Sequence, residues 1–90
     1  MKHTFKICGN LVSWTYTRLR GTANGWAYIN RDGKRQKVLI HTGISGRLRL
    51  ETECHEFIHI ANPTLDEAHV TEQARDLARI LYTLGYRLTR

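Results

Sequence analysis

The segment best suited to bind a metal or to catalyse a reaction is His55-Glu56-Phe57-Ile58-His59, which follows the pattern His-Glu-x-x-His. In a helix, residues four apart lie about 40° from one another around the axis, so both imidazoles would emerge on one face. Two ring nitrogens arranged in this way can reach one ion at the ~2.0–2.1 Å of zinc–histidine bonds. The spacing therefore predicts a zinc site with His55 and His59 as ligands.

Glu56 is the candidate catalytic residue of this motif. In a helix it lies about 100° around the axis from His55, where it can contact a water on the ion without being a ligand. Zinc lowers the pKa of such a water towards about 7, and a carboxylate can take the proton as the water attacks a carbonyl. The sequence therefore predicts a hydrolase with Glu56 as general base.

A catalytic zinc site needs a third protein ligand and an open position for water. The turn predicted at Asn62-Pro63 sends the chain back past the motif, so the ligand should lie early in the next helix. Glu67 is favoured because it lies at the edge of the apolar stripe that faces the first helix, although an acid there also suits the helix dipole. Three alternatives remain open, namely Asp66, His69 and Glu72.

The elements that must position these residues are strands followed by helices. Up to residue 43, alternating apolar and polar residues predict three or four antiparallel strands, with Asp32-Gly33 as a hairpin turn. The strand at 37–42 comes just before the motif and is interpreted as an edge strand to which an extended peptide could add. After Gly43 the apolar spacing changes from two to three or four residues, which indicates helices.

The first helix is expected to begin at Ser45-Gly46, to run to about Ala61 and to end before Pro63. Its predicted buried stripe is Leu50, Cys54, Phe57, Ile58 and Ala61. The second helix is expected to open at 64–65 and to stop at Gly85. Its predicted buried stripe is Val70, Gln73, Ala74, Leu77, Ile80, Leu81 and Leu84.

The predicted fold class is therefore α+β, a small antiparallel sheet of three or four strands followed by two packed helices. Ninety residues form a single domain over 1–90. Residues 1–43 are its sheet region, and residues 44–90 are its metal-binding helical region.

The composition is basic, with fourteen Lys and Arg against eight Asp and Glu. Most of the excess precedes residue 50, which suggests that the N-terminal half contacts nucleic acid or another acidic partner, or is simply a solvated basic surface. Four aromatic residues lie among these basic residues and either stack nucleobases or pack inside the sheet. They are Trp14, Tyr16, Trp26 and Tyr28, and at least half of them are expected to pack inside.

The remaining composition predicts a cytoplasmic protein with no membrane partner. No stretch approaches the ~18 apolar residues of a membrane span, and the start of the chain lacks the apolar run of a signal peptide. Two cysteines are too few for a disulfide framework, and Cys54 is expected to be a free thiol in the core. The oligomeric state is not predicted.

Part of the chain resembles a family of small phage and bacterial zincin-like metallopeptidases, and more distantly the ImmA/IrrE-type and SprT-like peptidases. The segments that carry the resemblance are 45–52, 55–59, 65–67, Val70, 74–79 and 84–87. The resemblance implies a cytoplasmic Zn2+-dependent peptidase acting on a protein or peptide, with the two histidines as ligands, Glu56 as general base and a third ligand near 66–67. The glycine that continues the motif in metzincins is absent, with Asn62 in its place.

Two functions follow from these observations. The favoured one is a metallopeptidase-like hydrolase with the metal ligands His55, His59 and Glu67. The alternative is a nucleic-acid- or protein-binding module in which the zinc is structural or catalytically silent.

Overall fold

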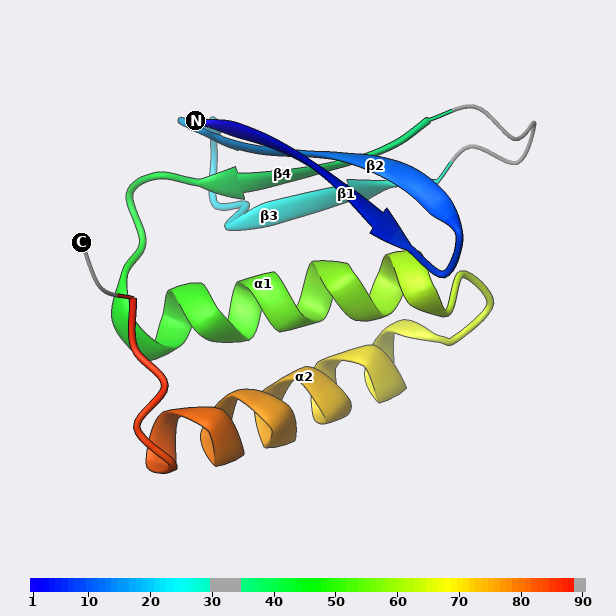
Figure 1. The fold of residues 1–90 in the computed structure, drawn as a ribbon. Helices are drawn as coiled ribbons and strands as arrows, with labels where there is room; N and C mark the ends of the chain where they lie inside the picture. Colours follow the sequence, from blue (N-terminus) through cyan, green and yellow to red (C-terminus); the bar gives the residue numbers. More distant parts are fainter. Residues whose placement is uncertain (30–34, 89–90) are drawn as a thin grey trace.

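The strands of this chain precede its helices, as the computed structural model shows for the residues that it describes, 1–29 and 35–88 (Figure 1). The elements are β1 (Lys2–Ile7), β2 (Asn10–Thr17), β3 (Gly25–Tyr28), β4 (Gln36–His41), α1 (Gly46–Ala61) and α2 (Glu67–Thr83). This order confirms the predicted α+β class of a small sheet followed by two helices.

The four strands form one sheet in the order β1-β2-β4-β3. β1 pairs with β2, and β3 with β4, in antiparallel fashion, whereas β2 and β4 are parallel. The expectation of antiparallel pairing throughout is therefore wrong for one pair, because β4 returns into the space between β2 and β3. The predicted turn at Asp32-Gly33 lies outside the described residues.

This strand order also corrects the predicted edge strand. β4, which contains the 37–41 segment, is paired on both sides, whereas β3 pairs with β4 alone among the described strands. The strand edge next to the helices is therefore that of β3. This matters for the site because α1 packs against β3 more extensively than against any other strand.

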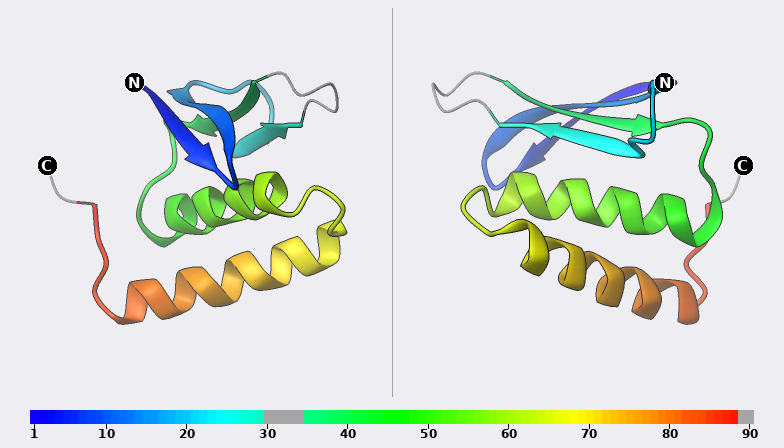
Figure 2. Two further views of the ribbon diagram at one scale, coloured as in Figure 1. Left: turned by 45° about the vertical axis from the view of Figure 1, so that its right-hand side comes forward. Right: turned by 180° about the vertical axis from the view of Figure 1, so that it is seen from behind.

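Both helices lie on the same side of the sheet, and α1 is the middle layer between the sheet and α2 (Figures 1 and 2). Residues four apart form rows along α1, so opposite rows face the two neighbouring layers. The row that faces the sheet is Thr52, Glu56 and Ile60. The row that faces α2 is Leu50, Cys54 and Ile58.

The predicted stripe of α1 is correct for Cys54 and Ile58, which are buried, and wrong for Phe57, which is 43% exposed. Phe57 projects to a side of the helix that neither layer covers. A helix packed on two opposite faces buries two narrow rows, so the single broad stripe expected from a surface helix does not describe it.

α2 begins at Glu67 with Asp66 as its N-cap, two or three residues later than predicted. Gly85 follows its end with φ +96°, and the hydrogen bonds from the backbone N–H of Gly85 and Tyr86 to the carbonyls of Tyr82 and Leu81 form a Schellman motif. The predicted stop is therefore confirmed. Among the described elements, α2 packs extensively on α1 only. Four residues of its predicted buried stripe are therefore exposed: Gln73, Leu77, Ile80 and Leu84.

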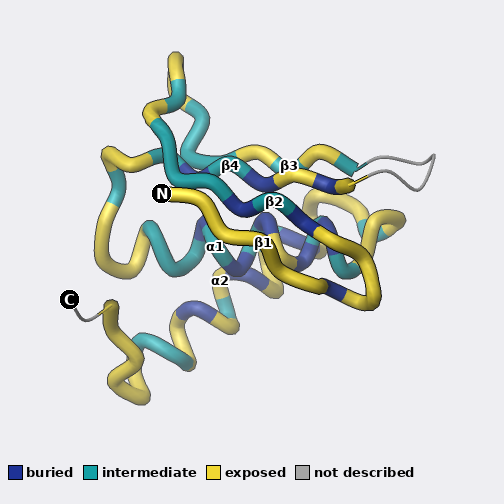
Figure 3. Tube along the Cα trace, turned by 45° about the horizontal axis from the view of Figure 1, so that its top comes forward, coloured by how far each residue is buried: buried dark blue, intermediate teal, exposed yellow. Residues whose placement is uncertain are grey.

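The core has two parts, one on each side of α1. Between the sheet and α1 lie Ile7, Val12, Trp14, Val38, Ile40 and Ile60. Between the helices lie Cys54, Ile58, Val70, Ala74 and Ala78. Figure 3 shows buried positions along β2, β4 and α1, whereas the edge strand β1 is exposed almost throughout. Neither described helix has the length and apolar character that a membrane span requires.

Candidate metal centre

His55 and His59 emerge from α1 along the gap between the sheet and α2. Around the axis of α1, the two histidines lie about 100° from the row that faces the sheet and about 100° from the row that faces α2. Their rings therefore enter neither part of the core. The Nε2 atoms of the two rings are 3.2 Å apart, and the ring centroids are 4.8 Å apart. About a fifth of each side chain is exposed, 22% and 23%. The helix thus presents two nitrogens side by side at the rim of the molecule.

Glu67 completes this group from the first turn of α2. Its Oε1 lies 2.8 Å from His55 Nε2, and its Oε2 lies 2.9 Å from His59 Nε2. The short connection through Pro63 reverses the chain, so that the start of α2 lies beside the end of α1 (Figure 1). The structure therefore brings together the three residues that the sequence favours as metal ligands.

The separations in this group suit a small tetrahedral ion. Ligand atoms bonded at ~2.0–2.1 Å to one such ion lie about 3.4 Å apart. The two histidine Nε2 atoms are already 3.2 Å apart, and one ligand atom from each of the three residues lies within 4.8 Å of the others. Two imidazoles and one carboxylate are a donor set typical of catalytic zinc. Within the described ranges, His55, His59 and Glu67 are the one group of three or more candidate ligands that converge.

The other candidate ligands lie elsewhere. Asp66 accepts hydrogen bonds from the backbone N–H of His69 at 2.8 Å and contacts the His69 ring nitrogen Nδ1 at 2.8 Å. These hydrogen bonds lower the pKa of Asp66 and occupy both residues in capping α2. Glu72 is exposed and does not join the histidine group.

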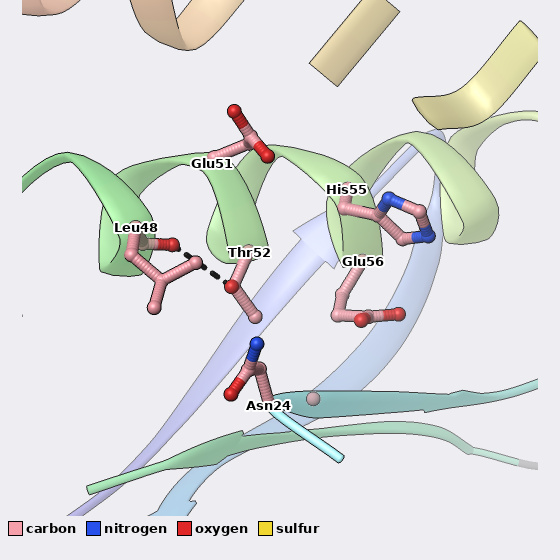
Figure 4. A pocket seen from close by; sticks show the side chains of 7 residues that line it. Asn24, Leu48, Glu51, Thr52, His55 and Glu56 are labelled. Carbon is pink, nitrogen blue, oxygen red and sulfur yellow. Dashed lines mark hydrogen bonds between the residues drawn. The ribbon is translucent and has the colours of Figure 1, made fainter. Parts of the chain in front are cut away.

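Glu56 is only 6% exposed and points from α1 towards the strands (Figure 4). Among the described residues its carboxylate has no hydrogen-bond or ion-pair partner. Burial raises its pKa to about 7, and the nearby negative charge of Glu67 adds to the rise. A buried carboxylate without a partner destabilises a fold, and such groups are found more often at functional sites than in ordinary cores.

Gly25, which sequence reasoning did not single out, makes room for Glu56. A Cβ at this position would lie 2.8 Å from Glu56 Oε2 and 2.9 Å from Thr52 Cγ2. The first residue of β3 therefore has to lack a side chain if α1 is to approach the strand with Glu56 between them. A glycine beginning a strand is the only signal in the sequence, since it often marks a close approach of the backbone to another group.

A cavity of about 310 Å³ connects these parts, since His55, Glu56, His59 and Glu67 all line it. Its remaining walls come from β3 and the residue after it: Gly25, Trp26, Ala27 and Ile29. A second hollow of about 210 Å³ shares Gly25, His55 and Glu56 and extends along α1 towards Leu48 (Figure 4). Space therefore exists on both sides of the His55–Glu56 pair.

No protein family, curated protein or solved structure matches this chain. The resemblance to zincin-like peptidases therefore stays a prediction.

Proposed function

We propose that this chain is a zinc-dependent hydrolase that cleaves peptide bonds. The observation that carries the proposal is the convergence of His55, His59 and Glu67 beside the buried carboxylate of Glu56, in one cavity. Three protein ligands leave the fourth position of a tetrahedral ion for water. A purely structural zinc site usually has four protein ligands and has no need of an unpaired carboxylate beside it.

The residues divide the chemistry between them. Zinc, when bound, activates a water molecule and polarises a carbonyl. His55, His59 and Glu67 hold and orient the ion. Glu56, which lies next in sequence to one ligand and lines the same cavity, takes the proton from the attacking water and passes it to the departing amine.

An extended peptide is the substrate class that the surroundings favour. β3 forms one wall of the cavity, and among the described strands only β4 pairs with it. The outer edge of β3 therefore offers backbone N–H and C=O groups to a chain that adds as a further strand. A peptide held there would pass the two hollows on either side of Glu56.

The experiment is a measurement of zinc per chain together with hydrolysis of a set of unstructured fluorogenic peptides. We expect one zinc per chain and a rate that falls by at least a hundredfold in Glu56→Gln, since general-base catalysis typically contributes about 10²–10⁴-fold. Glu56→Gln should keep its zinc. Glu72→Gln, which removes an exposed carboxylate on α2, should change neither quantity.

Two results would refute the proposal. If the protein takes up no zinc, the assignment of the metal site is wrong. If the protein binds zinc but the wild type and Glu56→Gln hydrolyse peptides equally fast, Glu56 is not the general base.

A further inference from the structure

Both described helices lie on one side of the sheet, so neither covers the face that points away from α1 (Figures 1 and 2). Because side chains alternate along each strand, the register decides which residues lie on it. Trp26 is paired with Leu39, and Tyr28 with Lys37, while Gly25 on the opposite face contacts α1. The outer face therefore carries Trp26, Tyr28 and Lys37, and the same register places Lys2 and Lys6 of β1 there.

The two aromatic residues of this face form an exposed pair. Trp26 is 51% and Tyr28 47% exposed. Their ring centroids are 6.5 Å apart and their planes differ by 30°, with Lys37 Nζ 5.4 Å from the Tyr28 ring centroid. The centroid spacing is roughly twice the ~3.4 Å rise between stacked bases, which is the spacing of two rings with one base stacked between them. Trp14 and Tyr16, by contrast, pack on the inner face, as expected for half of the four aromatics.

The positive charge of the chain is concentrated in the half of the sequence that contains the strands. Up to residue 45 the sequence has eight Lys and Arg and one acidic residue, whereas from residue 46 it has six Lys and Arg and seven acidic residues. The four strands that the structure describes contain no Asp or Glu. Every charged side chain on the outer face of these strands is therefore a lysine, and a phosphate backbone is the complementary partner.

We propose that this outer face binds single-stranded nucleic acid. Trp26 and Tyr28 stack on its bases, and Lys2, Lys6 and Lys37 contact its phosphates. Exposed aromatic rings beside lysines favour a nucleic acid over an acidic protein, because bases offer flat surfaces for stacking and carboxylates do not. A single strand is required because the bases of a duplex are stacked on one another and unavailable to a flat sheet. The metal ligands come from the helices on the other side of the sheet, and Trp26 also lines the cavity beside them. No metal ligand is among the residues that bind the nucleic acid, so the metal-free protein should bind as well.

The test is fluorescence anisotropy of a labelled twelve-nucleotide oligo(dT) with the whole chain. We expect binding that weakens about 20-fold between 50 and 200 mM salt, as three phosphate contacts on a single strand would give. Trp26→Ala should lose at least about fivefold in affinity, since one base stack is worth about 1–3 kcal/mol. Trp26→Phe, which keeps an aromatic ring, should recover most of that loss.

Matched controls separate this surface from general charge and from misfolding. Tyr86→Ala removes another exposed ring, 64% exposed, and Arg75→Gln removes an exposed charge on α2; both should bind within twofold of the wild type. Lys37→Gln should bind more weakly than Arg75→Gln. Four outcomes would overturn the proposal: no binding at 50 mM salt, equal losses in surface and control variants, tighter binding of the duplex, or displacement by polyglutamate as effective as by unlabelled oligo(dT).

Discussion

At the scale of single residues, neighbours in one helical turn have different environments. Glu56 is buried against the sheet, while His55 and His59 lie in the gap beside it. The cause is the ~100° between consecutive residues of a helix, which turns one side chain towards a core and the next away from it. The carboxylate of Glu56 is thereby shielded from solvent, whereas the imidazoles of His55 and His59 stay accessible to an ion.

The burial of Glu56 makes the metal-free protein less stable, and Glu56→Gln should relieve this cost. Its pKa is about 7 in the folded chain, above its ordinary 4.5, so the folded state favours the protonated form. Stability is therefore lost as the pH rises from about 4.5 to about 7. In urea unfolding with a chelator present, the free energy of unfolding of Glu56→Gln should rise relative to that of the wild type by up to about 3 kcal/mol from pH 5 to pH 8. A constant difference across this range would contradict the prediction.

Glu67 is predicted to be the third ligand, and its removal should weaken zinc binding selectively. Glu67→Ala should lower the affinity at least tenfold, because changes outside the ligand set already cost about 10–100-fold. Competition with a zinc-binding dye measures this loss. Glu72→Ala, on the same helix but outside the group, serves as the control. Equal affinities for the two variants would reassign the third ligand.

At the scale of elements, α1 is held to the sheet on the side away from the metal centre by a small polar network. Trp14 Nε1 donates to Tyr16 Oη at 2.9 Å, and Tyr16 Oη donates to Glu53 Oε2 at 2.5 Å. Arg49 donates to the same carboxylate oxygen, and its guanidinium lies 4.5 Å from the Tyr16 ring centroid. These contacts fix the rotation of α1 about its axis and thus the direction in which His55 points.

Tyr16→Phe should therefore destabilise the fold by about 1–3 kcal/mol, because it leaves the N–H of the buried Trp14 without an acceptor. Denaturant unfolding monitored by Trp fluorescence gives the value. Tyr86→Phe removes the same hydroxyl from an exposed ring and should stay within about 0.5 kcal/mol of the wild type. Similar values for both variants would show that the network contributes nothing.

At the scale of the whole molecule, the layers are held together unequally. α2 packs on α1 and makes no extensive contact with the described strands. Glu67 meets the two histidines at the end where α2 begins, so an ion bound there would link the outer layer to the middle one. A chain of ninety residues has a small core, and binding energy at such a site adds directly to its stability.

Zinc should therefore raise the thermal midpoint of unfolding in a concentration-dependent way. At a free concentration a hundred times the Kd, the gain is about 2.7 kcal/mol, equivalent to roughly 10–20 °C for a domain of this size. Differential scanning fluorimetry with zinc and with magnesium measures the shift, and magnesium should give none. His55→Ala should abolish the zinc shift, and an unchanged shift in that variant would place the ion elsewhere.

Much of the local structure follows from residues close together in the sequence. The α1 start at Ser45-Gly46, the helix break around Pro63 and the Gly85 stop were all predictable, because they depend on the backbone preferences of residues close together in the sequence. Ser45 is the N-cap although its side chain makes no cap hydrogen bond. The burial of Phe57 was predicted wrongly. A single sequence cannot show that a helix will be covered on two opposite faces, since the second cover comes from a distant segment.

Helical periodicity alone puts His55 and His59 on one face of a helix with Glu56 beside them, so this part of the site follows from the sequence. Tertiary packing is responsible for the rest of the site. It placed Glu67 rather than Asp66 against the imidazoles and made β3 the edge strand. It also turned two aromatic residues inwards and two outwards. These outcomes depend on strand order and on how the layers stack, which arise from packing between segments far apart in the chain.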